Sequence, residues 1–158
     1  MSSEEKQIVT FMVGKGEYGV DVQQVREIVT YKSCTKIPRV PSFIEGLMNL
    51  RGQVVLIVNL REFLEIASKE EGEAINKKIV IIDTSGTNIG FLVDEVFGVV
   101  RVSSDEIEAP PVSSQNIISG IFKRDDRLIM IMDAHRVISL LGNIIRPGEP
   151  IEAEMNVS

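Results

Sequence analysis

The chain has 158 residues, of which 44% are apolar and 25% charged, so it fits one globular domain or two small lobes that share a core. Seventeen basic residues against 23 acidic ones give a net charge of −6, and no Lys/Arg stripe is interleaved with aromatic residues, which argues against nucleic acid as a partner. The chain contains no apolar run near the ~18 residues of a membrane span, no signal-like start and a single cysteine, so we expect a cytoplasmic protein without direct membrane insertion.

Short β-branched runs that end in turn residues make up most of the chain, and such runs predict strands. The first covers 7–13. It is followed by a turn at 14–17, where glycines tolerate tight backbone geometry, and by a returning partner strand at 18–20. Further strands are expected at 54–58, 78–83, 88–93, 98–102, 117–123 and 127–132. Several of these runs are continuously apolar, which indicates strands that are buried on both faces.

The first helix is expected directly after the opening hairpin. Asp21, with Gln24 three residues later, matches a capping box. The helix would then carry Val22, Val25 and Ile28 on one side, because residues three apart lie on the same face of a helix.

Two more short helices follow runs that are expected to be strands. Asn59 is placed to cap a helix over 60–64. Asp133 is placed to cap a second one over 134–141, with Gly142 as its C-cap glycine. Two polar stretches, 67–77 and 108–114, are expected to be loops.

The two halves of the chain carry glycine and helix-capping residues in the same order. Gly46 and Asn59 recur 74 residues later as Gly120 and Asp133, in equivalent places around a strand and a short helix. Chance similarity between apolar strands is the alternative explanation. If the repeat is real, two small barrels filled by their own side chains would pack together. Packed lobes leave a groove between them that suits a peptide or helix of a partner.

Few residues could carry out chemistry. The only histidine, His135, is expected to be a surface or capping residue, and Cys34 a partly buried structural thiol. Asp94 and Glu95 could be imagined as an acid–base pair in a small hydrolase, but neighbours on an extended chain point opposite ways, so both are interpreted as solvated acids. No metal-ligand spacing or glycine-rich phosphate loop occurs. We therefore expect no catalytic residue, no metal site and no cofactor.

One segment, Asn49-Leu50-Arg51-Gly52, resembles the signature of CheW-like domains. Asn59-Leu60-Arg61 resembles the Asp/Asn-Leu-Arg that usually ends the strand after this signature. The stretches 18–28, 89–100 and 127–133 are similar to the other blocks of that family, in the same order. The likeness covers about residues 7–141. Relatives often carry proline where this chain has Leu56-Ile57, and aspartate in place of Asn59, which leaves the pairing of that strand open.

The resemblance implies an all-β fold with a few short helices, in which two intertwined, SH3-like, five-stranded barrels form one domain over 7–141. A polar arm (1–6) and a flexible tail (142–158) would flank the domain. It implies a non-enzymatic adaptor that couples the cytoplasmic hairpin tips of chemoreceptors to the regulatory domain of the histidine kinase CheA. The chain lacks room for a kinase core or a receiver domain, so we expect the stand-alone form. The alternative is a generic SH3-like peptide-binding module outside chemotaxis.

The resemblance also implies a receptor-facing groove. Glu27 and Arg51 match an acid and an arginine that the family places there, and we expect Glu27 to orient the arginine fork. Four apolar residues are expected to line the groove: Val25, Ile28, Val96 and Val99. The alternative is a turn arginine that serves backbone carbonyls, together with four ordinary core residues.

A kinase-facing surface is expected on the other face of one lobe. By position, the resemblance assigns it to Cys34, Thr35 and Ile37.

Overall fold

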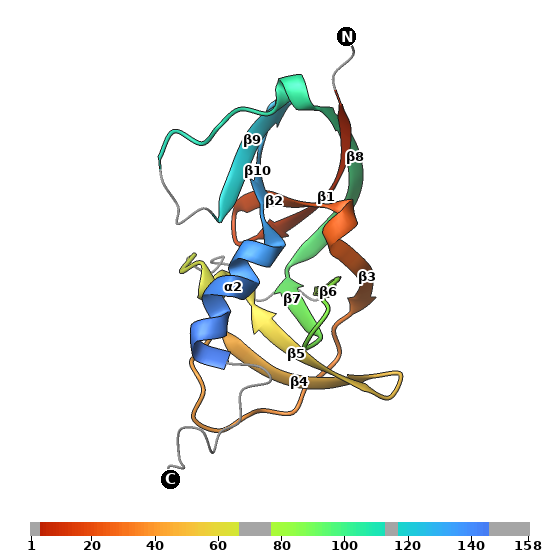
Figure 1. Ribbon diagram of the computed structural model, residues 1–158, viewed down its shortest axis with the longest axis vertical. Helices are drawn as coiled ribbons and strands as arrows, with labels where there is room; N and C mark the ends of the chain where they lie inside the picture. Colours follow the sequence, from red (N-terminus) through yellow and green to blue (C-terminus); the bar gives the residue numbers. More distant parts are fainter. Residues whose placement is uncertain (1–3, 67–76, 113–116, 146–158) are drawn as a thin grey trace.

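The computed structural model describes residues 4–66, 77–112 and 117–145. Ten strands account for most of them (Figure 1). In chain order the elements are β1 (Glu5–Val13), β2 (Gly16–Asp21), a 3-10 turn η1 (Val22–Gln24), β3 (Val25–Thr30), β4 (Ile44–Leu50), β5 (Gln53–Asn59), α1 (Leu60–Phe63), β6 (Lys78–Ile82), β7 (Ile89–Val93), β8 (Glu95–Ser103), η2 (Ser104–Glu106), β9 (Ile118–Arg124), β10 (Arg127–Met132) and α2 (Ala134–Ile145).

The strands form two five-stranded sheets. The first lobe has the order β8-β1-β2-β10-β9 and the second lobe the order β3-β6-β7-β5-β4. The lobes are stacked along the long axis, and α2 lies across their junction (Figure 1). This confirms the all-β, two-lobed, SH3-like fold. Within the described ranges the outermost strands of each sheet do not pair with each other, so neither lobe is a fully hydrogen-bonded barrel.

The internal repeat is also confirmed. Replacing β1 to β5 by β6 to β10 converts one sheet order into the other, including the parallel pairs β2·β10 and β7·β5. The halves do not form one lobe each, however. The first hairpin of each half joins the sheet made by the last three strands of the other half. Each lobe therefore needs both halves of the chain.

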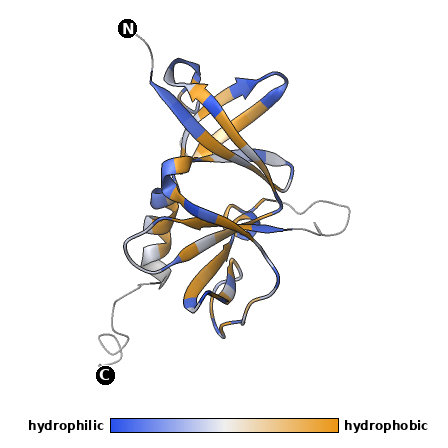
Figure 2. Ribbon diagram, turned by 90° about the vertical axis from the view of Figure 1, so that its right-hand side faces the viewer, coloured by the Kyte–Doolittle hydropathy of each residue, from blue (hydrophilic) through white to orange (hydrophobic). Residues whose placement is uncertain are grey.

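Three apolar cores hold this arrangement. The first lobe has its own core around Phe122 and Ile129, and the second lobe has one around Ile57 and Ile79. A larger shared core joins side chains of both sheets with the buried face of α2. Figure 2 shows apolar residues concentrated in the strands of both lobes. The continuous apolar runs arise because the inner strands face two cores at once.

The helix expected after Asp21 is wrong. Only the short turn η1 forms there, with Asp21 Oδ1 accepting a hydrogen bond from Gln23 N (2.9 Å), and the next residues form β3. Gln24 bonds to the cap of α2, donating to Asp133 Oδ1 (3.2 Å) and accepting from Ala134 N (2.9 Å). A helix-like spacing of three survives in β3 because a β-bulge shifts its register, as described below.

Other element boundaries differ less. The strand β4 is absent from the expected strands, and β1 begins inside the expected N-terminal arm, at Glu5. The caps Asn59 and Asp133 are confirmed, because their side chains accept from Glu62 N and Arg136 N, both at 3.2 Å. Gly142 lies inside α2, so its C-cap role is wrong. Most of the loop at 67–77 and most of the tail lie outside the described residues.

Candidate functional site

Arg51 stands at the tip of the hairpin that joins β4 to β5. Its φ of 51° and the φ of 84° at Gly52 are both positive, as a two-residue hairpin turn requires. The Asn49 side chain supports the turn by accepting a hydrogen bond from Gly52 N (2.9 Å). The arginine side chain is 67% exposed. An arginine in a left-handed conformation costs some stability, so this turn presents the guanidinium at an energetic cost.

Glu27 is the partner of this arginine. Arg51 Nη2 donates to Glu27 Oε2, which forms an ion pair between the β4–β5 turn and β3. Because β3 and β4 are the outermost strands of the second lobe, the pair bridges the open side of that sheet. The expected pairing is therefore present. The guanidinium binds a carboxylate here, in contrast to the alternative of a turn arginine that serves backbone carbonyls.

The four apolar candidates lie on the sides of β3 and β8 that face the shared core. Direct partners across an antiparallel pair share a face, and Val25 lies opposite Ile82 and Ile28 opposite Val80, both partners being members of the shared core. A register shift at Arg26 brings these i and i+3 residues to one face.

The same arrangement recurs 71 residues later in β8. Val96 lies opposite Phe11 and Val99 opposite Val9, with a register shift between the two pairs. Val25 and Val96 are half-buried against the shared core, which fits the core alternative for these two. Ile28 and Val99 are 37% and 54% exposed. Both strands run along the same side of the molecule, one from each lobe (Figure 1).

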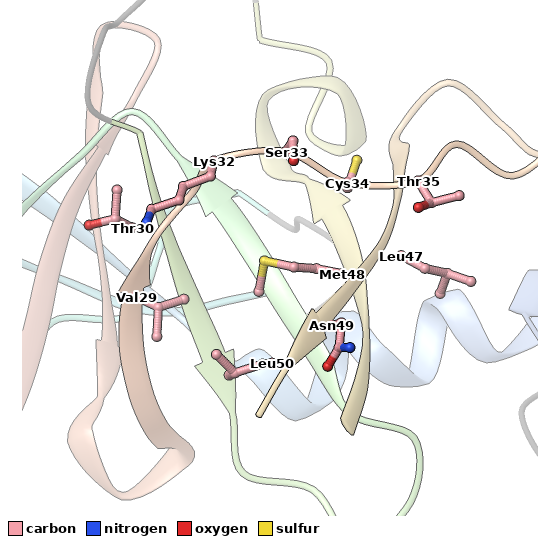
Figure 3. A pocket seen from close by; sticks show the side chains of 10 residues that line it. All are labelled: Val29, Thr30, Lys32, Ser33, Cys34, Thr35, Leu47, Met48, Asn49 and Leu50. Carbon is pink, nitrogen blue, oxygen red and sulfur yellow. The ribbon is translucent and has the colours of Figure 1, made fainter. Parts of the chain in front are cut away.

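A pocket of about 660 Å³ occupies the open side of the second lobe, between β3 and β4 (Figure 3). Its walls include Val29, Thr30, Leu47 and Met48, and the segment 32–35 covers one end. Of the expected kinase-facing residues, Cys34 and Thr35 line this pocket, whereas Ile37 packs against the shared core. Two backbone hydrogen bonds of 2.8 Å fasten Thr35 to Leu47 on β4.

Glu45 holds this segment in place, and sequence reasoning missed it. It sits at a register shift in β4 and is bound through its carboxylate by Tyr31 Oη (3.3 Å), Asn59 Nδ2 (3.3 Å) and Lys36 Nζ (3.7 Å). Its backbone carbonyl accepts from Cys34 Sγ (3.2 Å). Burial, then the Cys34 hydrogen bond and the Glu45 charge, raise the pKa of Tyr31 above its usual range, so this phenol stays a neutral donor.

Glu45 also explains why this chain has Asn59 where relatives often carry aspartate. The Asn59 amide donates to Glu45 while its oxygen caps α1. An aspartate could cap equally well but would bring a second carboxylate to about the same place. In the equivalent position of the other half, Asp133 receives its hydrogen bond from the amide of Gln24, so donor and acceptor are exchanged.

Changing Asn59 to aspartate should therefore lower the free energy of unfolding by about 1–2 kcal/mol at neutral pH, because a donor is lost and two carboxylates repel. Chemical denaturation would measure it. Adding Glu45→Gln should recover most of the loss, and Asp133→Asn serves as the matched change in the other half. Additive effects of Asn59→Asp and Glu45→Gln would contradict this coupling.

Asp94 is not a solvated acid, so that expectation is wrong. It is 7% exposed, and its Oδ2 accepts a hydrogen bond from Gly14 N (2.7 Å) in the β1–β2 turn. Its Oδ1 lies 3.7 Å from Arg61 Nη1. Glu95 is exposed, so the two carboxylates point apart as expected. Asp94 thus joins the hairpin of the first lobe to α1, at the crossing from β7 to β8.

The remaining candidates for chemistry are His135 and Cys34. His135 is exposed, with Nε2 2.9 Å from the carbonyl oxygen of Asp83. Cys34 is a partly buried free thiol. Within the described part of the chain, no three His, Cys, Asp or Glu side chains are grouped to hold a metal ion. No helix in that part is both long and apolar enough to cross a membrane.

Comparison with known proteins agrees on one family. The model of the CheW-like domain matches residues 7–141. The chemotaxis protein CheW of Bacillus subtilis is 36% identical over 138 residues, covering 85% of this chain and 86% of that protein. CheW of Treponema pallidum is 30% identical over 145 residues, covering 88% and 85%. The crystal structure of the scaffolding protein TtCheW from Thermoanaerobacter tengcongensis superposes with a TM-score of 0.80 at 32% identity, covering 92% of this chain and 100% of that chain.

Proposed function

The chain belongs to the CheW-like domain family, and from this membership we propose that it is a non-catalytic chemotaxis adaptor that couples the cytoplasmic tips of chemoreceptors to the histidine kinase CheA. Its relatives are chemotaxis proteins, and one solved relative is a scaffolding protein. The observation that carries the proposal is that β3 contributes to two different surfaces. Val25 and Ile28 face the junction of the lobes, whereas Val29 lines the pocket.

The receptor-binding surface in this proposal combines the junction side of β3 and β8 with the Arg51 hairpin. Ile28 and Val99 expose apolar area, and the arginine presents a planar charged group held by Glu27. A helical hairpin that carries apolar side chains and a carboxylate matches this combination, because arginine binds carboxylates through two parallel bonds.

The kinase-binding surface in this proposal is the pocket between β3 and β4 with the segment that covers it. Its walls combine apolar side chains of β3 and β4 with polar ones of the covering segment, and Cys34 and Thr35 are fixed to β4 by hydrogen bonds. A preformed surface loses little conformational entropy on binding, which favours a stable contact. The adaptor would then act in the cytoplasm, at receptor arrays, with both partners bound at once.

Co-sedimentation tests the proposal directly. A receptor cytoplasmic fragment assembled on vesicles is mixed with CheA, with and without this chain, and the pellet is analysed. We expect CheA to enter the pellet only when this chain is present. A generic SH3-like peptide-binding module would not be retained by the receptor fragment, and that result would favour the alternative.

Replacing Arg51 with alanine should weaken binding to the receptor fragment about tenfold, since arginine is a frequent hot-spot residue. Because the ion pair is exposed, the free energy of unfolding should change by no more than about 1 kcal/mol. Calorimetric titration and thermal unfolding measure the two effects. Arg127→Ala is the matched control, because Arg127 is also an exposed arginine that is ion-paired with a glutamate, Glu17, but lies on β10, outside the proposed surface. Loss of folding in Arg51→Ala would instead indicate a structural role.

A further inference from the structure

An exposed aromatic side chain lies at an irregularity in the pairing of β8 with β1. Phe97 is 49% exposed, and it is the one exposed aromatic residue in the described ranges. Thr10 pairs with Gly98 and Phe11 with Val96, so Phe97 has no register partner on β1. The next residue, Gly98, has a φ of 139°, which side-chain-bearing residues rarely adopt. Together these features form a β-bulge, a device that re-aims a side chain at a sheet edge.

The internal repeat shows that the fold does not require an aromatic residue here. The equivalent bulge in β3 is at Arg26, between Val25 and Glu27. Arg26 is exposed and donates to Asn88 Oδ1 (3.0 Å). The same backbone irregularity therefore accepts a polar side chain. A half-exposed phenylalanine forgoes much of the free energy that burial of a ring provides, so its presence calls for another reason.

Phe97 lies within the surface that we assign to the receptor. Its strand neighbours Val96 and Val99 are two of the four apolar candidates. Six large apolar residues are exposed in the described part of the chain, and three of them, Ile28, Phe97 and Val99, belong to β3 and β8. These two strands lie on one side of the molecule, which faces the viewer in Figure 2.

We propose that Phe97 is the aromatic anchor of this surface and inserts its ring into an apolar recess on the chemoreceptor hairpin. The proposal rests on the function proposed above. Aromatic residues dominate interface energetics because a rigid ring buries a large area at low entropic cost. Phe97 lies between Val96 and Val99 along β8, so one hairpin that covers this stretch can contact all three.

Four variants test the anchor by titration against the receptor cytoplasmic fragment, with thermal unfolding measured alongside. Phe97→Ser and Phe97→Arg should each weaken binding about 30-fold or more, while Phe97→Tyr keeps most of the affinity. Phe97→Arg places in β8 the residue type found at the equivalent bulge of β3. Leu128→Ser is the matched control, because Leu128 is 54% exposed on β10 of the same lobe, and it should bind as the unmodified chain does. Unfolding midpoints and CheA binding should be unchanged in all four.

The outcomes separate this inference from the function on which it rests. If the unmodified chain binds the fragment and Phe97→Ser binds within about twofold of it, only the anchor is overturned. A lower unfolding midpoint or a parallel loss of CheA binding would mean a structural role and would also overturn it. So would variants that alter only self-association in sedimentation, which would assign Phe97 to a contact between copies. Failure of the unmodified chain to bind overturns both proposals.

Discussion

Replacing Asp94 with alanine should lower the free energy of unfolding by about 3 kcal/mol, because the change leaves two buried or nearly buried groups without a partner. Gly14 N would lose its acceptor at 2.7 Å, and Arg61, whose side chain is 19% exposed, would lose its carboxylate. The lost contacts lie where the chain passes from β7 of the second lobe to β8 of the first, so we expect both lobes to be destabilised and to unfold together. Denaturant titration followed by circular dichroism measures the change.

Two further variants identify which property of Asp94 stabilises the fold. Asp94→Asn keeps an oxygen for Gly14 N and should lose only part of the stability, whereas Glu95→Ala removes an exposed neighbouring acid and should stay within about 0.5 kcal/mol of the unmodified chain. Equal effects at the two acidic positions would show that the buried contacts of Asp94 contribute nothing special.

Gly46→Ala should be the most damaging small substitution in the second lobe. A Cβ atom at Gly46 would lie 2.4 Å from Thr35 O and 2.7 Å from Cys34 Sγ, and the φ of 147° disfavours any side chain. We expect a loss of about 3 kcal/mol from strain and steric overlap together. Because relief requires the segment at 34–35 to move off β4, binding to CheA should fall more than binding to the receptor fragment.

Gly52→Ala is the matched control for this change. Gly52 also has a positive φ, 84°, but nothing lies within 4 Å of its Cβ position. Only the backbone cost of about 1 kcal/mol is expected. Similar losses at the two glycines would show that steric contact with Thr35 and Cys34 is not what limits Gly46.

Most strands could be predicted because their apolar runs are long and end at clear turn residues. The offsets between glycines and caps revealed the repeat, because the two halves fold through equivalent strands. The exchange of hairpins could not be derived from periodicity, since a strand has the same pattern whichever sheet it joins. Here the family resemblance supplied the intertwined arrangement.

The bulge in β3 explains the one wrong helix. Val25 and Ile28 share a face because Arg26 is bulged, which imitates the spacing of a helix over a few residues. A local pattern of this length cannot distinguish a helix from a bulged strand, and only the pairing with β6 decides between them.

For the site, the resemblance brought together Glu27 and Arg51, and the structure shows them in contact. Sequence patterns missed Glu45 and the buried state of Asp94, because both depend on partners distant in sequence. Asp94 bonds to Gly14 and Glu45 to Tyr31, and neither pairing leaves a local signal. The binding roles of all the site residues stay predictions.

The exchange of hairpins also sets the order in which the molecule can be completed during its synthesis. All strands of the second lobe come from the continuous stretch 25–93, so its sheet can be assembled before the rest of the chain leaves the ribosome. The hairpin of β1 and β2 emerges first, yet its neighbours β8 and β10 belong to the last three strands of the chain. In the nascent chain β1 therefore lacks its partner β8 until translation has passed Ser103, and β2 lacks its partner β10 until translation has passed Met132.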